Sequence, residues 1–395
     1  EDNQDSSILI FLPGQGEIRR ATEDLASAIS RNNIQDVYLR PLFGNLSIED
    51  QQLAIAPLDS TRERKVVLAT NIAETSLTIE GVDVVIDSGM AREPIFDPTT
   101  GMTRLQTVKI SKASTIQRSG RAGRLRPGVC YRLWSADQQE QLAAHTTPEI
   151  MIADLAPLAL QLLQWGVDDP AELSWLDQPP AGPWNQALSL LASLGATAIT
   201  DNNLTLTAHG QLMSSLPVHP RLSHLLIRSI EVGYQQMGIL LASLLSDRDP
   251  FEDDPDITSR LDILLGITPC PGRHRGWAKR TEQLSHQIEK NLRQHKIKRS
   301  DQVLTDAQVP GFLIACAYPD RIARRRHSGG YQLANGRSAS LVGNPSLGKS
   351  DWLAVAEVSG TIRSQGDTIR SAAALDSSLF DSALIDLVMD QTIAD

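Results

Sequence analysis

Five short apolar runs, rich in β-branched residues, constrain the fold of the first third of the chain more than any other feature. Most are bounded by Gly, Pro, Asp or Asn, and stretches with helical periodicity at 17–30 and 47–56 separate the first three. Nearly continuous apolar strands joined by helices are typical of a parallel sheet covered on both faces. The sequence therefore predicts an α/β domain over 1–138. Its strands are expected at Ile8–Leu12, Val37–Leu39, Val66–Ala69, Val82–Ile86 and Val129–Leu133.

A second feature is the basic segment 117–126, which holds four arginines and no acidic residue. If the segment is helical, Arg121 and Arg124 share one face. Guanidinium groups suit a phosphate chain because they bind its oxygens bidentately and keep their charge. For such a cluster on its own, a solvated basic helix is the alternative interpretation.

Segment 117–124, Gln-Arg-Ser-Gly-Arg-Ala-Gly-Arg, resembles motif VI of superfamily 2 helicases. Upstream, 70–79 resembles motif V of the DEAH/RHA RNA helicases, and 8–14 with 41–44 is similar to their motif IV region. Segments 216–221 and 317–324 are similar to bacterial members of that group, so the likeness extends over most of the chain. Motifs that occur in the expected order indicate a helicase more strongly than any one of them.

The resemblance implies roles for individual residues. Gln117 is expected near the γ-phosphate and the attacking water, and Arg121 and Arg124 are expected to act as arginine fingers. The residues implied to contact the nucleotide are Ser76, Thr78 and Glu80. Those implied to hold the RNA backbone, without reading bases, are Gly44, Asn45, Thr70, Asn71 and Thr75. For motif V, capping of strand ends by Thr and Asn is the structural alternative.

The implied cofactor is ATP with Mg²⁺, bound mainly by a first RecA-like lobe. Segment 343–350 matches the Walker A letters, but the residues after it are typical of a strand, whereas a phosphate loop leads into a helix. The sequence contains no Asp-Glu-x-His motif, and it begins with Glu1 rather than Met. We therefore predict the C-terminal portion of a longer helicase, inactive in ATP hydrolysis without its first lobe.

Accessory domains are expected after the helicase lobe. Segments 92–96 and 102–107 flank a turn and predict a β-hairpin. Helices followed by a small ribbon around 201–203 indicate a winged helix over 139–215. Residues 216–326 read as a helical, ratchet-like bundle. Short strand-like runs at Tyr331–Leu333, Ala339–Val342 and Trp352–Val358 suggest a small β-barrel over 327–395, and the resemblance implies an OB-like one. The pattern at 378–392 predicts a terminal helix.

The chain carries a net charge of −10, which argues against a globally basic nucleic-acid-binding protein. Local charge still decides contact, because screening acts over about 10 Å. The basic stretch 273–299, and a second one at Arg321 and 324–326, are either solvated faces or a track for a phosphate backbone. We interpret the acidic loop 247–256 as solvated and expect no metal site, because neither its spacing nor that of the histidines fits one.

The three cysteines, Cys130, Cys270 and Cys316, lie far apart in the sequence and fit a reducing cytoplasm. No apolar run reaches the roughly 18 residues of a membrane span, so no membrane partner is expected. Two functions remain open. The first is the C-terminal part of an ATP-dependent RNA helicase that moves along single-stranded or partly duplex RNA. The second is a non-enzymatic nucleic-acid-binding or regulatory protein. DNA as the bound strand is not excluded, because backbone contacts distinguish it poorly from RNA.

Overall fold

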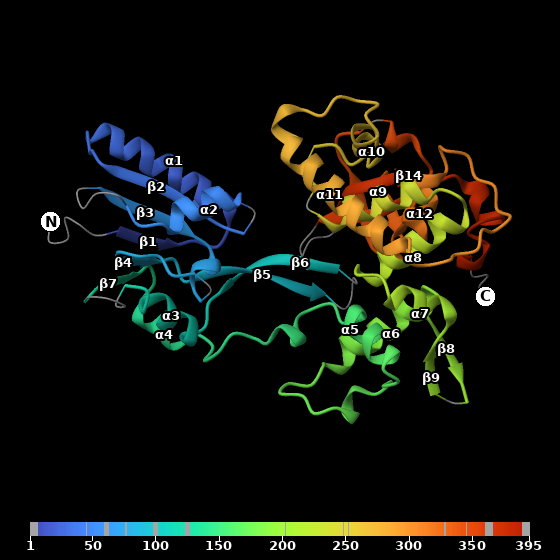
Figure 1. Cartoon of the computed structure of the whole chain (residues 1–395), viewed down its shortest axis with the longest axis horizontal. Helices are drawn as coiled ribbons and strands as arrows, with labels where there is room; N and C mark the ends of the chain where they lie inside the picture. The colour runs from blue at the N-terminus through green and yellow to red at the C-terminus, as the bar shows by residue number, and fades with distance from the viewer. Residues whose placement is uncertain are drawn as a thin grey trace. The chain divides into compact units, whose positions relative to one another are not determined.

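The computed structural model describes residues 7–44, 46–58, 63–75, 77–97, 102–122, 127–201, 203–247, 249–251, 253–327, 329–344, 346–359 and 366–388. The chain divides into two compact units. The first comprises Glu1–Asp97 and Met102–Ala153, and the second comprises Asp154–Asp395 with 98–101 (Figure 1).

The first unit is built on a five-stranded parallel sheet in the order β2-β3-β1-β4-β7, which confirms the predicted RecA-like fold. Each of the five predicted apolar runs forms one strand. The strands are β1 (Ser7–Phe11), β2 (Val37–Leu42), β3 (Arg64–Ala69), β4 (Val82–Asp87) and β7 (Val129–Arg132). The connecting helices are α1 (Gln15–Arg31) and α2 (Ile48–Ile55), as expected.

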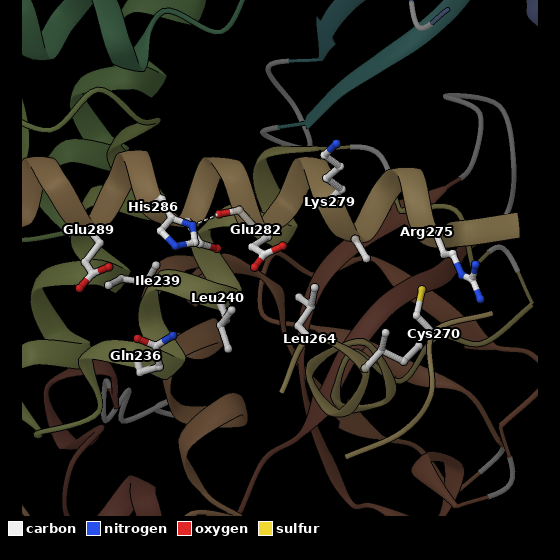
Figure 2. Close-up of a pocket in the computed structure, with 13 residues that line it drawn as sticks. Gln236, Ile239, Leu240, Leu264, Cys270, Arg275, Lys279, Glu282, His286 and Glu289 are labelled. Atoms are coloured by element: carbon white, nitrogen blue, oxygen red, sulfur yellow. Dashed lines mark hydrogen bonds between the residues drawn. The ribbon is translucent and has the colours of Figure 1, made fainter. Parts of the chain in front are cut away.

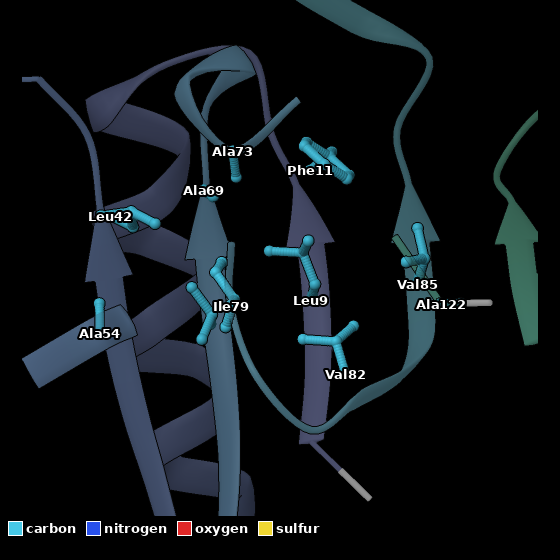
Figure 3. Packing of buried hydrophobic residues seen from close by; sticks show 11 residues of the cluster. Leu9, Phe11, Leu42, Ala54, Ala69, Ala73, Ile79, Val82, Val85 and Ala122 are labelled. Atoms are coloured by element: carbon cyan, nitrogen blue, oxygen red, sulfur yellow. The ribbon is translucent and has the colours of Figure 1, made fainter. Parts of the chain in front are cut away.

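Both faces of this sheet carry an apolar core. On one face, Ile18 of α1 packs with Val66 and Leu68 of β3. On the other face, a larger cluster surrounds Phe11 and Val85 (Figure 3). Alternation along each strand divides the apolar side chains between the two clusters, because successive residues point to opposite faces.

The predicted hairpin is confirmed as β5 (Met90–Asp97) paired with β6 (Met102–Lys109). It leads into α3 (Lys112–Ser119), which begins after Ser111, whose hydroxyl accepts a bond from the Ser114 amide at 3.1 Å. Helix α4 (Ala136–Glu140) begins with a capping box between Ser135 and Gln138. Such caps satisfy amide groups that have no partner within a helix.

The second unit begins with helices and a small hairpin. Its α-helices are α5 (Ala156–Gln164), α6 (Ala181–Ser193), α7 (Ala208–Ser214), α8 (Pro220–Glu231), α9 (Gln235–Ser246), α10 (Thr258–Leu264), α11 (Arg275–Leu292) and α12 (Val309–Ala317). The predicted ribbon is present as β8 (Thr197–Thr200) and β9 (Asn203–Leu206), and the winged-helix assignment remains a prediction. Throughout the described ranges, no helix is both long and apolar enough to cross a membrane.

A closed barrel in the order β10-β11-β12-β14-β13 ends the fold and confirms the predicted β-barrel. The sequence did not predict its first and last strands. The strands are β10 (Ile322–Arg325), β11 (Tyr331–Leu333), β12 (Ser338–Leu341), β13 (Trp352–Ser359) and β14 (Asp367–Ala374).

Short 3-10 turns lie at Glu149–Met151, Pro170–Glu172, Gly272–His274 and Pro319–Arg321.

The expected terminal helix over 378–392 is wrong in its described part. Two 3-10 turns, Ser377–Asp381 and Ile385–Leu387, occupy that stretch up to residue 388. Ser382 between them has φ −142 and ψ −96, which no helix accommodates. Phe380 stacks edge-on against Trp352 of the barrel at 4.8 Å, so side-chain packing replaces helical regularity there.

The acidic loop at 247–256 is not simply solvated, which corrects our interpretation. It wraps Arg260, which is fully buried. Arg260 Nε donates to Asp249 Oδ2 at 2.8 Å, and Arg260 Nη2 donates to the Phe251 carbonyl at 2.7 Å. A buried guanidinium requires such partners, so the acidic residues complete a structural site.

The Walker A look-alike is confirmed as a coincidence of letters. Only a 3-10 turn, Leu347–Lys349, follows its loop, and strand β13 comes next. Asn344 instead binds the acidic loop, with Nδ2 donating to Asp254 Oδ1 at 3.0 Å. Without a helix, its amide groups cannot converge on a phosphate.

Arg321 does not belong to a surface basic run, unlike Arg324, Arg325 and Arg326, which are exposed. Its Nη1 donates to the Ala356 carbonyl at 2.7 Å, and its guanidinium lies 4.6 Å from the Tyr318 ring centroid. Arg221 lies over the same ring and donates to Asp320 at 2.6 Å. The two segments that resembled bacterial helicases, 216–221 and 317–324, thus meet at the Tyr318 ring.

A pair of neutral imidazoles predicts acid sensitivity of the second unit. His209 Nε2 and His224 Nδ1 are 2.7 Å apart. Burial, with Arg228 nearby, lowers the pKa of His209 to about 4, and burial, His209 and Arg228 hold the pKa of His224 well below 6.5. The unfolded chain, with imidazole pKa values of about 6.5, therefore binds more protons than the folded chain below that pH.

We expect the free energy of unfolding to be constant with respect to these groups above about pH 7. It should fall by up to about 1.4 kcal/mol per pH unit for each imidazole as the pH drops from 6.5 toward 4. Urea unfolding at pH 7, 6 and 5 measures this slope. His224→Gln should flatten it, whereas His327→Gln, at an exposed site, should not. Equal slopes in both variants would contradict the assignment.

Candidate functional site

The residues assigned to RNA gather at the carboxyl edge of the sheet. Gly44 follows β2, and Thr70 and Asn71 follow the neighbouring strand β3. The Thr70 amide donates to the Leu42 carbonyl at 3.2 Å, which holds the two loops together. Gly44, Asn71 and Thr75 are exposed. Asn45, assigned to the same group, lies outside the described residues.

Motif V then crosses one face of the sheet toward the start of β4. The crossing begins with a 3-10 turn, Asn71–Ala73, whose Ala73 is buried, and Ile79 is buried farther along (Figure 3). Thr78 and Glu80, assigned to the nucleotide, are exposed on this crossing. Ser76 lies outside the described part of the chain. Along this crossing the RNA-assigned residues, which end at Thr75, come directly before the nucleotide-assigned residues.

Motif VI begins within helix α3, where two neighbouring side chains are exposed. Gln117, assigned to the γ-phosphate and the attacking water, is exposed, and the neighbouring Ile116 is 68% exposed. An exposed glutamine beside an exposed isoleucine suits a surface that meets another domain. Arg124, the second predicted finger, lies outside the described residues.

Arg121 is turned inward and is only 7% exposed. Its Nε donates to the Glu74 carbonyl at 2.9 Å, and its Nη1 donates to the Leu77 carbonyl at 2.6 Å. Nη2 also donates to the Glu74 carbonyl. In this conformation the guanidinium joins motif VI to the backbone of motif V, a contact that sequence reasoning did not predict.

Arg118 forms the buried centre of the site at 1% exposure. Its Nε donates to Glu74 Oε2 at 3.0 Å, and its Nη1 donates to Asp87 Oδ1 at 2.9 Å and to the Met90 carbonyl at 3.2 Å. The guanidinium also lies 4.8 Å from the Phe11 ring centroid. One side chain thereby connects motif V, the end of β4, the start of the hairpin and β1.

The carboxylates of this network are as constrained as the arginine. Asp87 Oδ1 also accepts from the Gly89 amide at 2.9 Å. Its Oδ2 is buried and has no hydrogen-bond partner in the described part of the protein. The buried Asp87 carboxylate and the partly buried Glu74 carboxylate are stabilised by the fixed positive charge of Arg118 between them. The sequence analysis included Arg118 in motif VI but gave it no role, because its partners Glu74 and Asp87 are 44 and 31 residues away in the chain.

A cavity of about 150 Å³ adjoins the network. Asn71, Thr75 and Glu74 of motif V line it, together with Arg118 and with Glu93 of the hairpin. Asn71 and Thr75, two exposed residues assigned to RNA, therefore line the same cavity as the ion-paired Glu74 and Arg118. Motif V contacts Arg118 directly through Glu74.

A second polar surface lies on helix α11 of the other unit. The basic residues of stretch 273–299 are all exposed, while Trp277 and Ile288 face the core. A groove of about 460 Å³ runs between α11 and the helices α9 and α10, with Arg275 and Lys279 among its lining residues (Figure 2). Part of the charge is paired, since Arg280 contacts Asp247 at 3.1 Å and Arg293 contacts Glu289 at 3.0 Å.

The chain offers few groups for a triphosphate and its metal. No cluster of His, Cys, Asp or Glu that could hold a metal ion occurs among the described residues. The Gly-rich segment 343–350 lacks the helix that a phosphate loop needs. The groups that fit a nucleotide are those around motifs V and VI, which suits a surface that completes a site built elsewhere.

A RecA-like sheet whose motifs V and VI are joined by buried arginines defines a helicase-type lobe. Residues 1–126 match the family model of the helicase conserved C-terminal domain. The ATP-dependent RNA helicase HrpB of Escherichia coli (strain K12) is 42% identical over 351 residues, 89% of this chain and 40% of that protein.

Two solved structures are similar to nearly the whole chain. One, a crystal structure of the E. coli DExH-box NTPase HrpB, gives a TM-score of 0.78 with 39% identity, covering 96% of this chain and 44% of that chain. The other, of the Escherichia coli DEAH/RHA helicase HrpB, gives 0.79 with 40% identity, covering 94% and 44%. The chain is thus similar to DEAH/RHA helicases over nearly its whole length. It spans less than half the length of these relatives.

Replacing Arg118 by methionine should destabilise the first unit strongly. The change leaves Asp87 and Glu74 without their cation, and breaking a buried ion pair costs about 3–5 kcal/mol. Urea unfolding monitored by circular dichroism measures the loss. Arg20→Met is the matched control, because Arg20 pairs with Glu17 at a side-chain exposure of 73% and should cost at most about 1 kcal/mol.

The triple change Arg118→Met, Asp87→Asn and Glu74→Gln should recover part of the lost stability, because it removes the buried charges together. If Arg118→Met and Arg20→Met lost the same stability, the network would not have the role we assign to it.

Proposed function

We propose that this chain is the second lobe and accessory part of an ATP-dependent RNA helicase. In this proposal a first RecA-like lobe of the same protein binds ATP and Mg²⁺. This chain completes the site with motif VI and holds the RNA backbone with motif V. The single observation that carries the proposal is the buried contact of Arg118 and Arg121 with motif V, which ties motif VI to the segment that holds the nucleotide-assigned and RNA-assigned residues.

Three features support a site completed by another lobe. Gln117 and Ile116 are exposed side by side on α3. Thr78 and Glu80 are exposed on the crossing segment. Groups that could bind a triphosphate alone are lacking among the described residues, as shown above. A surface with phosphate-binding side chains but no phosphate loop suits catalysis shared between two domains.

In the proposed cycle, closure of the two lobes brings Gln117 to the attacking water. Arg121 supplies positive charge to the γ-phosphate, as does Arg124 by the family resemblance. Arg121 presently binds backbone carbonyls of motif V, so a move toward phosphate loosens that segment. The RNA-assigned residues follow within the same segment. ATP hydrolysis and a change in the RNA contacts are thereby coupled, because both involve the hydrogen bonds between Arg121 and motif V.

RNA as the bound strand is inferred from the relatives, since HrpB is named an ATP-dependent RNA helicase. The exposed Asn71 and Thr75 offer amide and hydroxyl donors that suit phosphates without base readout. The exposed basic residues of α11 add a second place for a phosphate backbone. A chain with net charge −10 must bind a polyanion through such local surfaces.

ATP turnover in the protein that includes the preceding lobe tests the proposed catalysis. Arg121→Ala should lower RNA-stimulated kcat by about 10³, the loss typical of an arginine finger. Arg132→Ala, at an exposed arginine of β7, should leave kcat within about twofold, because surface changes of this kind are usually nearly neutral. Thermal unfolding of both variants separates catalysis from folding. Unchanged turnover in Arg121→Ala would remove the finger assignment, and no turnover in the unaltered protein would favour a non-enzymatic binding function.

RNA dependence of the same turnover tests the backbone assignment. Asn71→Ala should raise the RNA concentration for half-maximal stimulation by about five- to tenfold, which corresponds to about 1 kcal/mol for one lost hydrogen bond. Gln35→Ala removes an exposed amide before the opposite, amino-terminal edge of the sheet and should not shift that concentration. An equal shift in the two variants would contradict the assignment, and equal stimulation by DNA would widen the substrate class.

A further inference from the structure

The segment that follows α4 runs back to the start of α3, the helix in which motif VI begins. Lys112, in the first turn of α3, donates its amide hydrogen to the Ala143 carbonyl at 2.8 Å. The next amide, of Ala113, donates to the Ala144 carbonyl at 3.1 Å. Residues 143–152 are called the strap below. The strap is therefore bonded by its backbone to the helix of motif VI.

The first amides of a helix have no partner within the helix, and water or a side chain usually satisfies them. In α3 the Ser114 amide donates to the Ser111 hydroxyl at 3.1 Å, and the strap accepts from the two amides before it. Protein groups thus satisfy the first three amides of this helix. Because two of the acceptors belong to another segment, the start of the helix is fixed in position as well as stabilised.

Thr146 adds a side-chain contact at the same place. Its Oγ1 lies 3.2 Å from Ser111 Oγ and 3.5 Å from Ser114 Oγ, and either hydroxyl of each pair can donate. Ser111 and Ser114 are 4% and 8% exposed, whereas Thr146 is exposed. The Thr146 hydroxyl therefore joins the exposed strap to two buried serines at the start of α3.

Thr146 also lines the cavity of about 150 Å³ beside the buried ion pairs. Ser114 and Arg118, one turn apart on α3, line it as well. On the side of motif V, Asn71 and Thr75 belong to the same lining. A residue outside the motifs identified above thus shares a small space with motifs V and VI, and it contacts α3 one turn before Arg118.

The strap is also held at its other end. The Ile152 carbonyl accepts from the Phe96 amide of β5 at 2.6 Å, and Pro148 and the 3-10 turn Glu149–Met151 lie between the two points of attachment. Two residues after Ile152, the Asp154 carboxylate accepts from the first amide of α5 at 2.9 Å. A segment that is bonded near both ends, with a proline between, is a short fixed connection and not a flexible linker.

We propose that the strap is a positioning element for motif VI and that Thr146 is its decisive side chain. By holding the start of α3, it sets the orientation in which the helix presents Gln117 and Arg118. Thr146 acts through α3 and is therefore a positioning residue. The contact with α3 is independent of catalysis, whereas its effect on turnover rests on the proposed function, in which motif VI acts on the γ-phosphate.

Hydrogen exchange, followed by mass spectrometry of peptides that cover the start of α3, tests the contact. Thr146→Val removes the hydroxyl and keeps a side chain of similar size. The Lys112 and Ala113 amides should then exchange about fivefold faster, which corresponds to about 1 kcal/mol for one lost hydrogen bond. Thr146→Ser keeps the hydroxyl and should exchange like the unaltered chain. Thr147→Val, at the adjacent exposed threonine, is the matched control and should leave the exchange rates unchanged.

ATP turnover in the protein that includes the preceding lobe tests the effect on motif VI. Thr146→Val should lower the RNA-stimulated kcat about fivefold and leave the KM for ATP within about twofold, because the groups of motif VI act on the transition state in the proposed mechanism. Thr146→Ser should restore kcat, and Thr147→Val should not change it. The fall in kcat without a rise in KM, together with the rescue by serine, distinguishes positioning from a general loss of folded protein.

Other outcomes overturn the proposal. Unchanged exchange at the start of α3 in Thr146→Val, or an equal change in Thr147→Val, would show that the strap does not hold the helix through Thr146. Faster exchange with unchanged turnover, in a protein whose turnover Arg121→Ala does lower, would reduce the strap to a helix cap without influence on motif VI. If the unaltered protein has no turnover, the proposed function fails, and the exchange rates alone decide whether the strap holds α3.

Discussion

The first unit depends on one buried charge. Arg118 lies among Glu74, Asp87, the Met90 carbonyl and the Phe11 ring. Because a buried guanidinium must be matched by carboxylates or carbonyls, the positions of motif V, β4 and the hairpin depend on one another. The buried ion pairs of Arg118 therefore also hold in place the polar residues at the carboxyl edge of the sheet.

Buried arginines recur as internal connections throughout this acidic protein. Arg121 holds the carbonyls of motif V, Arg260 organises the acidic loop, and Arg321 binds the barrel strand at Ala356. The planar, permanently charged guanidinium suits this role because it satisfies several acceptors at once. The number of arginines in a basic stretch of sequence therefore does not give the positive charge that is available on the surface to bind a nucleic acid.

The arrangement of motif V supports the proposed coupling between nucleotide and RNA. Its RNA-assigned end lies beside β2 and β3, and its nucleotide-assigned end crosses toward β4. Arg121 binds the carbonyls of Glu74 and Leu77 between those ends. These hydrogen bonds are the contacts through which the proposed coupling would act.

The sequence by itself determined the parallel sheet, the hairpin, the barrel and the family, because strand periodicity and ordered motifs are local signals. Thr70 and Asn71 directly follow the predicted strand Val66–Ala69, and the structure has them there, although their roles and that of Gln117 stay predictions. Only the tertiary structure decided that Arg118 pairs with Glu74 and Asp87, that Arg321 is buried, and that 377–387 is not an α-helix. Those outcomes depend on contacts between residues that are far apart in the chain. A local sequence pattern does not show which distant residue a buried side chain will contact.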